Sequence, residues 1–97
     1  MSSYSFADAA VQDLDDICEY IARSDARAAS RFFDNLRQQC KLAASFPKMG
    51  KSYKKLAPGL RGLTVNDYLI LYYPSDDGIT IARIVNGYRD LESLFDD

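Results

Sequence analysis

The feature that most constrains this fold is a change of hydrophobic period near Pro47. Before this proline, apolar residues recur at steps of three and four, which is the period of an amphipathic helix. After it, short runs of β-branched and aromatic residues alternate with turn residues, which is typical of strands. Helices followed by strands predict an α+β structure, in which a helical hairpin packs on one face of a small sheet. With 97 residues, we expect a single domain over 1–97.

The first half predicts a short strand and two helices. Residues 3–6 form the expected strand, and Ser5 and Asp8 have the spacing of a capping box at the start of the first helix. This helix should cover about residues 8–23, and Ser24-Asp25 should cap a second helix that ends before Pro47. Because the link is short, the helices should be antiparallel. The expected core positions are Val11, Leu14, Ile17, Cys18 and Ile21, then Ala29, Phe32, Phe33, Leu36, Cys40 and Ala43.

The second half predicts three strands, over residues 60–65, 68–73 and 79–85. The short polar links between them favour an antiparallel meander. The expected order of elements is therefore β-α-α-β-β-β, with a small antiparallel sheet. A last amphipathic stretch over 89–95 forms either one helical turn or a docked tail.

Composition excludes several classes of protein. The chain is 47% apolar and 27% charged, as expected for a folded globular domain. No apolar run approaches the roughly 20 residues of a membrane-spanning helix, and the N-terminus has no basic or apolar leader, so we expect a cytoplasmic protein without a membrane partner. Cys18 and Cys40 fall on the helical stripes and are expected to be buried packing residues. Without histidine we expect no Cys/His metal site, and we expect no cofactor.

Charge is unevenly distributed along the chain. Residues 8–19 of the first helix carry five acids with no base among them, whereas residues 48–66 carry five bases and no acid: Lys48, Lys51, Lys54, Lys55 and Arg61. Each cluster is either a solvated surface or, for the basic loop, a surface that steers an anionic partner. The sequence pI of about 5.0 argues against direct nucleic-acid binding through overall positive charge.

Few catalytic mechanisms are open to these residues. Without histidine, the usual serine and cysteine triads cannot form, and no phosphate-cradling loop motif is present. RNA cleavage is the remaining chemistry, because Lys54, Arg61, Arg83 and Tyr88 together would stabilise a phosphorane-like transition state. Two of these residues also have a structural interpretation. Arg83 lies among apolar residues and must pair, project from the open sheet face or serve a function, and Tyr88 is otherwise a packing or rim residue.

The residues resemble the ParE branch of the RelE/ParE superfamily of type II toxins over nearly the whole chain. The resemblance is carried by Ala10-x-x-x-Leu14-x-x-Ile17-x-x-Tyr20-Ile21-Ala22, Ala28-Ala29-x-x-Phe32, Pro47-x-x-Gly50, Pro58-Gly59-Leu60-Arg61, Tyr68-x-Ile70-x-Tyr72-Tyr73 and Ile81-x-Arg83-Ile84-Val85-x-Gly87-x-Arg89-Asp90.

The resemblance implies a toxin that a ParD-like antitoxin neutralises. ParE-type toxins inhibit DNA gyrase, whereas RelE-type relatives are basic and cut messenger RNA in the ribosome. This chain is mildly acidic, and it has Asn86-Gly87 where many relatives have histidine before the glycine. We therefore expect a non-enzymatic inhibitor of gyrase with no catalytic residues, whose target contacts are Arg61, Arg83, Tyr88 and Arg89. The alternatives are a ribosome-dependent endoribonuclease and a degenerate toxin that only binds antitoxin.

Overall fold

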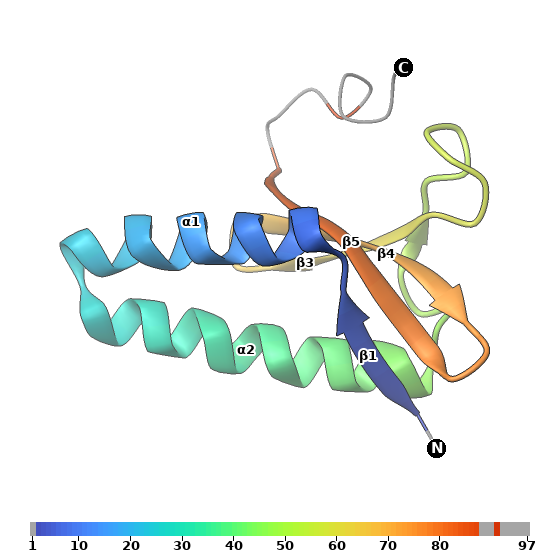
Figure 1. Cartoon of the computed structure of the whole chain (residues 1–97), viewed down its shortest axis with the longest axis horizontal. Helices are drawn as coiled ribbons and strands as arrows, with labels where there is room; N and C mark the ends of the chain where they lie inside the picture. The colour runs from blue at the N-terminus through green and yellow to red at the C-terminus, as the bar shows by residue number, and fades with distance from the viewer. Residues whose placement is uncertain (1, 88–90, 92–97) are drawn as a thin grey trace.

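The structure is a computed structural model that describes residues 2–87 and residue 91. Figure 1 shows two long helices lying side by side, with the sheet crossing one end of the pair. The α+β class is confirmed, as is every predicted helix and strand. The stretch expected over 89–95 lies, apart from Leu91, outside the described residues. The elements are β1 (Ser3–Phe6), α1 (Asp8–Ser24), α2 (Ala26–Ser45), β2 (Lys51–Ser52), β3 (Arg61–Val65), β4 (Tyr68–Ser75) and β5 (Gly78–Asn86).

The sheet is mixed, in the order β1-β5-β4-β3-β2. Strands β2 to β5 pair antiparallel, as expected, but β1 pairs parallel with β5, with Ser3 opposite Gly78 and Phe6 opposite Ile81. The expectation of a purely antiparallel sheet was therefore wrong for one strand. Short links reveal only local hairpins, whereas a parallel pair needs a long crossover, and here nearly the whole chain lies between the two strands. The two-residue β2 was also not predicted.

The two helices begin in different ways. The predicted capping box of α1 was wrong, because Ser5 lies within β1 opposite Thr80 and Ala7 occupies the N-cap without a side-chain bond. The Ala7 amide instead donates to the Ile81 carbonyl at 2.9 Å, so the sheet fixes the start of the helix. The predicted cap of α2 is confirmed, since the Asp25 carboxylate accepts from the amides of the second and third residues after it.

The main core lies between the helices and one face of the sheet. Its buried members include Ala10, Phe32, Leu36, Cys40 and Ala43 from the helices and Val65, Ile70, Tyr72, Ile79, Ile81 and Ile84 from the strands. Cys40 is buried, as predicted, and Cys18 packs half-buried at the margin. Val11 and Phe33 were expected in this core but are 45% and 40% exposed. Phe32 takes the inward position, and one helical step rotates Phe33 away from it.

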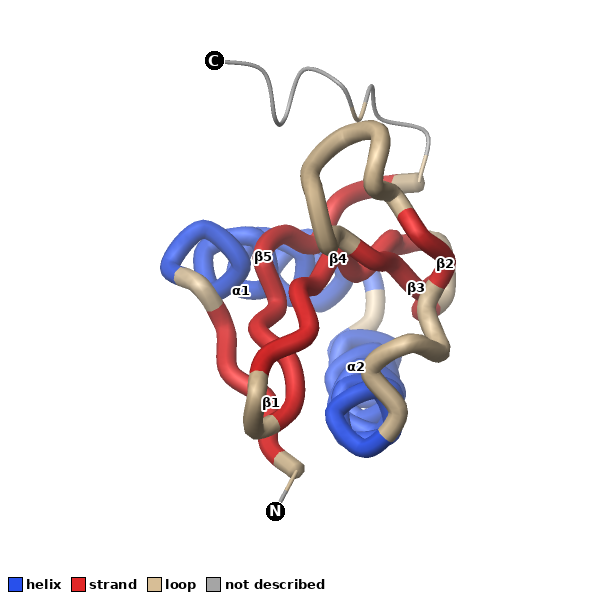
Figure 2. Tube along the Cα trace, turned by 90° about the vertical axis from the view of Figure 1, so that its right-hand side faces the viewer, coloured by secondary structure: helices blue, strands red, loops and turns tan. Residues whose placement is uncertain are grey.

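A second, smaller core covers the other face of the sheet. It contains Leu60, Leu69, Leu71 and Val85, against which Tyr53, Leu56, Ala57, Tyr73 and Leu91 pack. Figure 2 shows the loop between β2 and β3, which supplies several of these residues, rising from the sheet on the side away from α2. Strand β4 is therefore buried on both faces, which explains its nearly continuous apolar sequence from Leu69 to Tyr73.

A candidate protein-interaction site beside Arg61

The chain segment that follows α2 is held in place by a buried tyrosine. The Tyr72 hydroxyl donates to the Pro47 carbonyl at 2.8 Å and accepts from the Gly50 amide at 3.0 Å. A side chain at position 50 would place its Cβ 2.6 Å from that hydroxyl, so only glycine fits this approach. Because Tyr72 is completely buried, the core of the protein fixes the position of the segment Pro47–Gly50.

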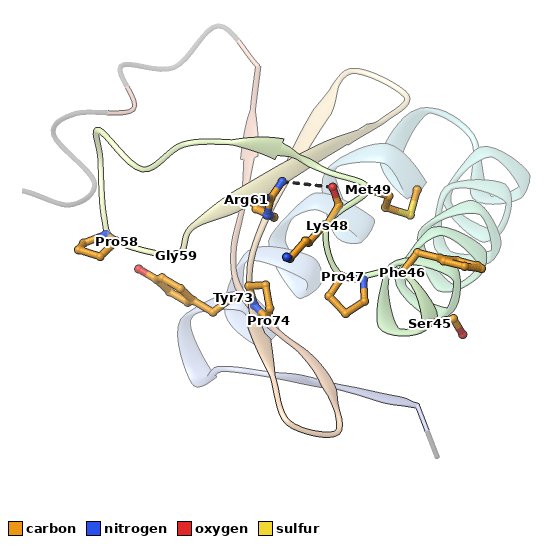
Figure 3. Close-up of a pocket in the computed structure, with 10 residues that line it drawn as sticks. All are labelled: Ser45, Phe46, Pro47, Lys48, Met49, Pro58, Gly59, Arg61, Tyr73 and Pro74. Atoms are coloured by element: carbon orange, nitrogen blue, oxygen red, sulfur yellow. Dashed lines mark hydrogen bonds between the residues drawn. The ribbon is translucent and has the colours of Figure 1, made fainter.

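Arg61, one of the predicted target contacts, fastens the same segment. It lies at the start of β3, opposite Tyr72, and its Nη1 donates to the Gly50 carbonyl at 2.7 Å. The same nitrogen donates to the Lys48 carbonyl at 3.2 Å (Figure 3). Both acceptors are neutral, so these bonds do not cancel the charge of the guanidinium. Among the described residues, no acid forms an ion pair with Arg61.

A cavity of about 800 Å³ opens beside this arginine. In Figure 3, Phe46 and Met49 lie at the α2 end of the cavity, and Pro58 and Tyr73 lie across from them. Phe46 is 63% exposed and Met49 43% exposed, which is unusual for side chains of this size. The complete lining is Ser45, Phe46, Pro47, Lys48, Met49, Pro58, Gly59, Arg61, Tyr73 and Pro74. We call this cavity the Arg61 pocket.

The surroundings of the pocket are positively charged. The five basic residues of the segment 48–66 have no acid among them in sequence. Among the described residues, none of these five takes part in an ion pair, since the pairs that form are Arg23–Glu19, Arg31–Asp25 and Arg83–Asp13. Lys51 instead lies over the Tyr53 ring, with its Nζ 5.6 Å from the ring centroid. The pocket therefore combines apolar walls with an unneutralised basic border.

Arg83, the second predicted contact, is in a different environment. The pairing of β4 with β5 shifts so that Tyr72 faces Ile81 and Leu71 faces Arg83, which leaves Ala82 as an extra residue. Such a bulge bends the strand and redirects its side chains. The Arg83 guanidinium meets the Asp13 carboxylate of α1 through two bonds, Nε to Oδ2 at 2.7 Å and Nη2 to Oδ1 at 3.0 Å.

The same carboxylate also accepts from the Ile84 amide at 3.0 Å. Hydrogen bonding to Asp13 raises the pKa of Arg83 above its ordinary value, although burial acts in the opposite direction. Of the interpretations open to Arg83 from the sequence, the structure therefore has the paired one. Asp13 is correspondingly a structural partner rather than one more solvated charge on α1.

The predicted site residues do not meet at one point. Arg61 on β3 contacts the segment after α2, whereas Arg83 on β5 contacts α1, and β4 lies between the two strands. Lys54 is exposed on the loop between β2 and β3. Tyr88 and Arg89 lie outside the described residues.

Within the described part of the chain, no group of three or more cysteine and acidic residues is placed to hold a metal ion, and no helix is long and apolar enough to cross a bilayer.

Sequence reasoning missed the apolar walls of the pocket. Phe46 gave no signal in the sequence, because it comes three residues after Ala43, where the stripe of buried positions 32, 36, 40 and 43 would continue. Only the structure shows that Phe46 is the C-cap residue of α2 and is 63% exposed. The clamp by Tyr72 gave no signal either, because its partner atoms are backbone groups more than twenty residues away.

Three comparisons show which known proteins this chain resembles. A family model described as "ParE toxin of type II toxin-antitoxin system, parDE" matches residues 4–91. Toxin ParE3 of Caulobacter vibrioides is 29% identical over 76 residues, which cover 78% of this chain and 73% of that protein. A solved structure described as the chromosomal ParDE TA system from P. aeruginosa matches with a TM-score of 0.71 and 24% identity, covering 89% of this chain and 96% of that one. At that identity, the last match bears on the fold.

Proposed function

Because the chain belongs to the ParE toxin family of type II toxin–antitoxin systems, we propose that it inhibits its target by binding and that a ParD-like antitoxin neutralises it. The proposed target is DNA gyrase, the enzyme that ParE-type toxins are known for inhibiting, and the proposed site of action is the cytoplasm. The observation that carries the binding mechanism is the separation of Arg61 from Arg83.

Cleavage of an RNA phosphodiester requires several groups to converge on one phosphate and its developing charge. Arg83 is held by Asp13 and Ile84, while Arg61 is turned toward the segment after α2. The chain also contains no histidine to act as a general base near neutral pH. These features favour a binding surface over a catalytic centre.

Among the residues predicted to contact the target, Arg61 is the one we retain as the main candidate. Its charge has no acidic partner among the described residues, and arginine beside exposed aromatic surface is typical of energetic hot spots in protein interfaces. Arg83 already donates two bonds to Asp13, so its charge is balanced within the fold. We keep Arg83, Tyr88 and Arg89 as secondary candidates.

The decisive experiment exposes purified DNA gyrase and, separately, translating ribosomes to the toxin. We expect gyrase to lose supercoiling activity, transcripts to remain intact, and prior addition of antitoxin to restore supercoiling. New transcript ends at ribosomal A-site codons with unaffected gyrase would replace this proposal with the ribonuclease. No effect in either assay, from toxin that still binds antitoxin, would identify a degenerate toxin.

A further inference from the structure

The Arg61 pocket is already formed in the isolated chain. Its walls come from the end of α2, the Pro58-Gly59 turn and β4, and the buried hydroxyl of Tyr72 holds the segment Pro47–Gly50 in place. At about 800 Å³, the pocket lies within the usual range of ligand sites and accommodates more than one bulky side chain. Because its walls are fixed beforehand, an occupant would bind without the cost of ordering them.

The apolar surface continues beyond the pocket along α2. Leu42, Phe46 and Met49 are spaced by four and three residues, and each is more than 40% exposed. Phe46 is the C-cap residue of α2 and lines the pocket, and its amide donates to the Leu42 carbonyl, so Leu42 lies one helical turn before Phe46. A small molecule would fill the pocket but leave Leu42 uncovered. The extent of the surface therefore favours a polypeptide that lies along α2 and inserts a side chain into the pocket.

The charge of the border selects the chemistry of that polypeptide. Lys48 and Arg61 line the pocket, and Lys51 comes three residues after Lys48 in the sequence. Among the described residues, no acid forms an ion pair with any of these three cations. Carboxylates are the complementary groups. A nucleic acid fits less well, since most of the lining comes from proline, phenylalanine, methionine and glycine residues, which offer few hydrogen bonds to bases or phosphates.

We propose that this pocket is the site where the antitoxin is anchored, an inference that rests on the proposed function. An antitoxin segment inserts a bulky apolar side chain between Phe46 and Tyr73, and acidic residues flanking that side chain lie against Lys48 and Lys51. An antitoxin bound in this way covers Arg61, so the same contact that holds it would deny the target this arginine.

The first test measures affinity for the full-length antitoxin that co-purifies with the toxin when the gene pair is expressed together. After separation, wild-type toxin and four variants are titrated with this antitoxin by calorimetry at low and high salt. Lys48→Glu should weaken binding about 10- to 100-fold, mainly at low salt, and Phe46→Ser by a similar factor at both salt concentrations. Both side chains are exposed, so both variants should fold, which thermal melts would verify.

Two matched controls separate the pocket from general effects. Lys55→Glu makes the same change of charge outside the pocket, and Phe33→Ser removes an exposed phenylalanine elsewhere on α2. Each should change affinity less than about threefold. Equal weakening by Lys48→Glu and Lys55→Glu, or no effect of Phe46→Ser, would overturn the proposed anchor. Titration with single-stranded RNA provides a further arm, in which RNA binding lost in Lys48→Glu with antitoxin affinity unchanged would also overturn it.

The second test identifies the segment that enters the pocket. A photo-crosslinking phenylalanine derivative placed at Phe46 should form a crosslink to an antitoxin peptide that contains both a large apolar residue and neighbouring acids. A crosslink to a basic segment would refute the proposed chemistry. The gyrase assay separates this inference from the function on which it rests: if wild-type toxin binds antitoxin through the pocket but leaves gyrase active, the proposed target fails and the anchor stands.

Discussion

Removal of the Asp13 carboxylate tests whether the hydrogen bonds between α1 and β5 stabilise the fold. This side chain joins α1 to the bulge of β5 by accepting two bonds from Arg83 and one from the Ile84 amide. In the Asp13→Ala variant, the guanidinium and the amide lose their acceptor together. We expect the protein to fold with a substantially lower free energy of unfolding.

The magnitude follows from how exposed each partner is. The Arg83 side chain is 26% exposed, so its guanidinium can rehydrate, and the loss of its two bonds should cost about 1 kcal/mol. Ile84 is only 2% exposed, so water cannot replace the lost acceptor, and leaving its buried amide unpaired should cost about 1–3 kcal/mol. Together these give about 2–4 kcal/mol, a large part of the roughly 5–15 kcal/mol that stabilises a typical domain. For a domain of this size, the melting temperature should fall by about 10–25 °C.

Chemical denaturation and thermal melts by circular dichroism would measure this loss. Asp15→Ala is the matched control, because it removes the same charge two residues after Asp13. Asp15 is exposed and forms no hydrogen bond or ion pair in the described structure, so its loss should change stability by less than about 0.5 kcal/mol. Asp13→Asn should fall between the two, since its amide oxygen can still accept from Ile84. If Asp13→Ala and Asp15→Ala melted at the same temperature, the argument that this carboxylate joins helix to sheet would fail.

Three further outcomes are expected. Gly78→Ala should abolish the pairing of β1 with β5 and sharply lower the melting temperature, because its Cβ would lie 1.8 Å from the Ser3 carbonyl oxygen; Gly87→Ala, whose Cβ meets nothing closer than 3.5 Å, should melt like wild type. Tyr72→Phe should cost about 1–3 kcal/mol in chemical denaturation by leaving the Pro47 carbonyl and the Gly50 amide unpaired, and an unchanged midpoint would contradict the clamp. Burial raises the pKa of Cys40 to about 12, so a thiol reagent at pH 8 should label Cys18 in the native protein and Cys40 only after unfolding.

The sequence predicted the elements of the fold well because their signals are local. Helical periodicity, the Asp25 cap and the turn residues each depend on neighbours a few positions away. The errors arose where the structure depends on contacts between segments that are far apart in the sequence. The parallel pairing of β1 depends on β5 at the other end of the chain, and this pairing also took Ser5 out of the predicted capping box.

The candidate site was predictable only in part, for the same reason. The basic loop was visible in the sequence, because a run of cations without acids needs no fold to be recognised. The pocket was not visible, because its walls come from three segments that meet only after Tyr72 bonds to the backbone of the chain following α2. Arg61 and Arg83 looked alike as cations among strand residues, and only their partners distinguish them.

Those partners determine what each arginine can still do. Arg83 directs two nitrogens at one carboxylate, which neutralises its charge and occupies one edge of its planar guanidinium. Arg61 uses a single nitrogen for two neutral carbonyls, so most of its donors and its whole charge remain for another molecule. An arginine committed to a carboxylate inside its own fold contributes mainly to stability, whereas one that only positions backbone at the border of an apolar pocket is prepared for an acidic partner. The difference lies in the acceptors, which no pattern of residues around either arginine encodes.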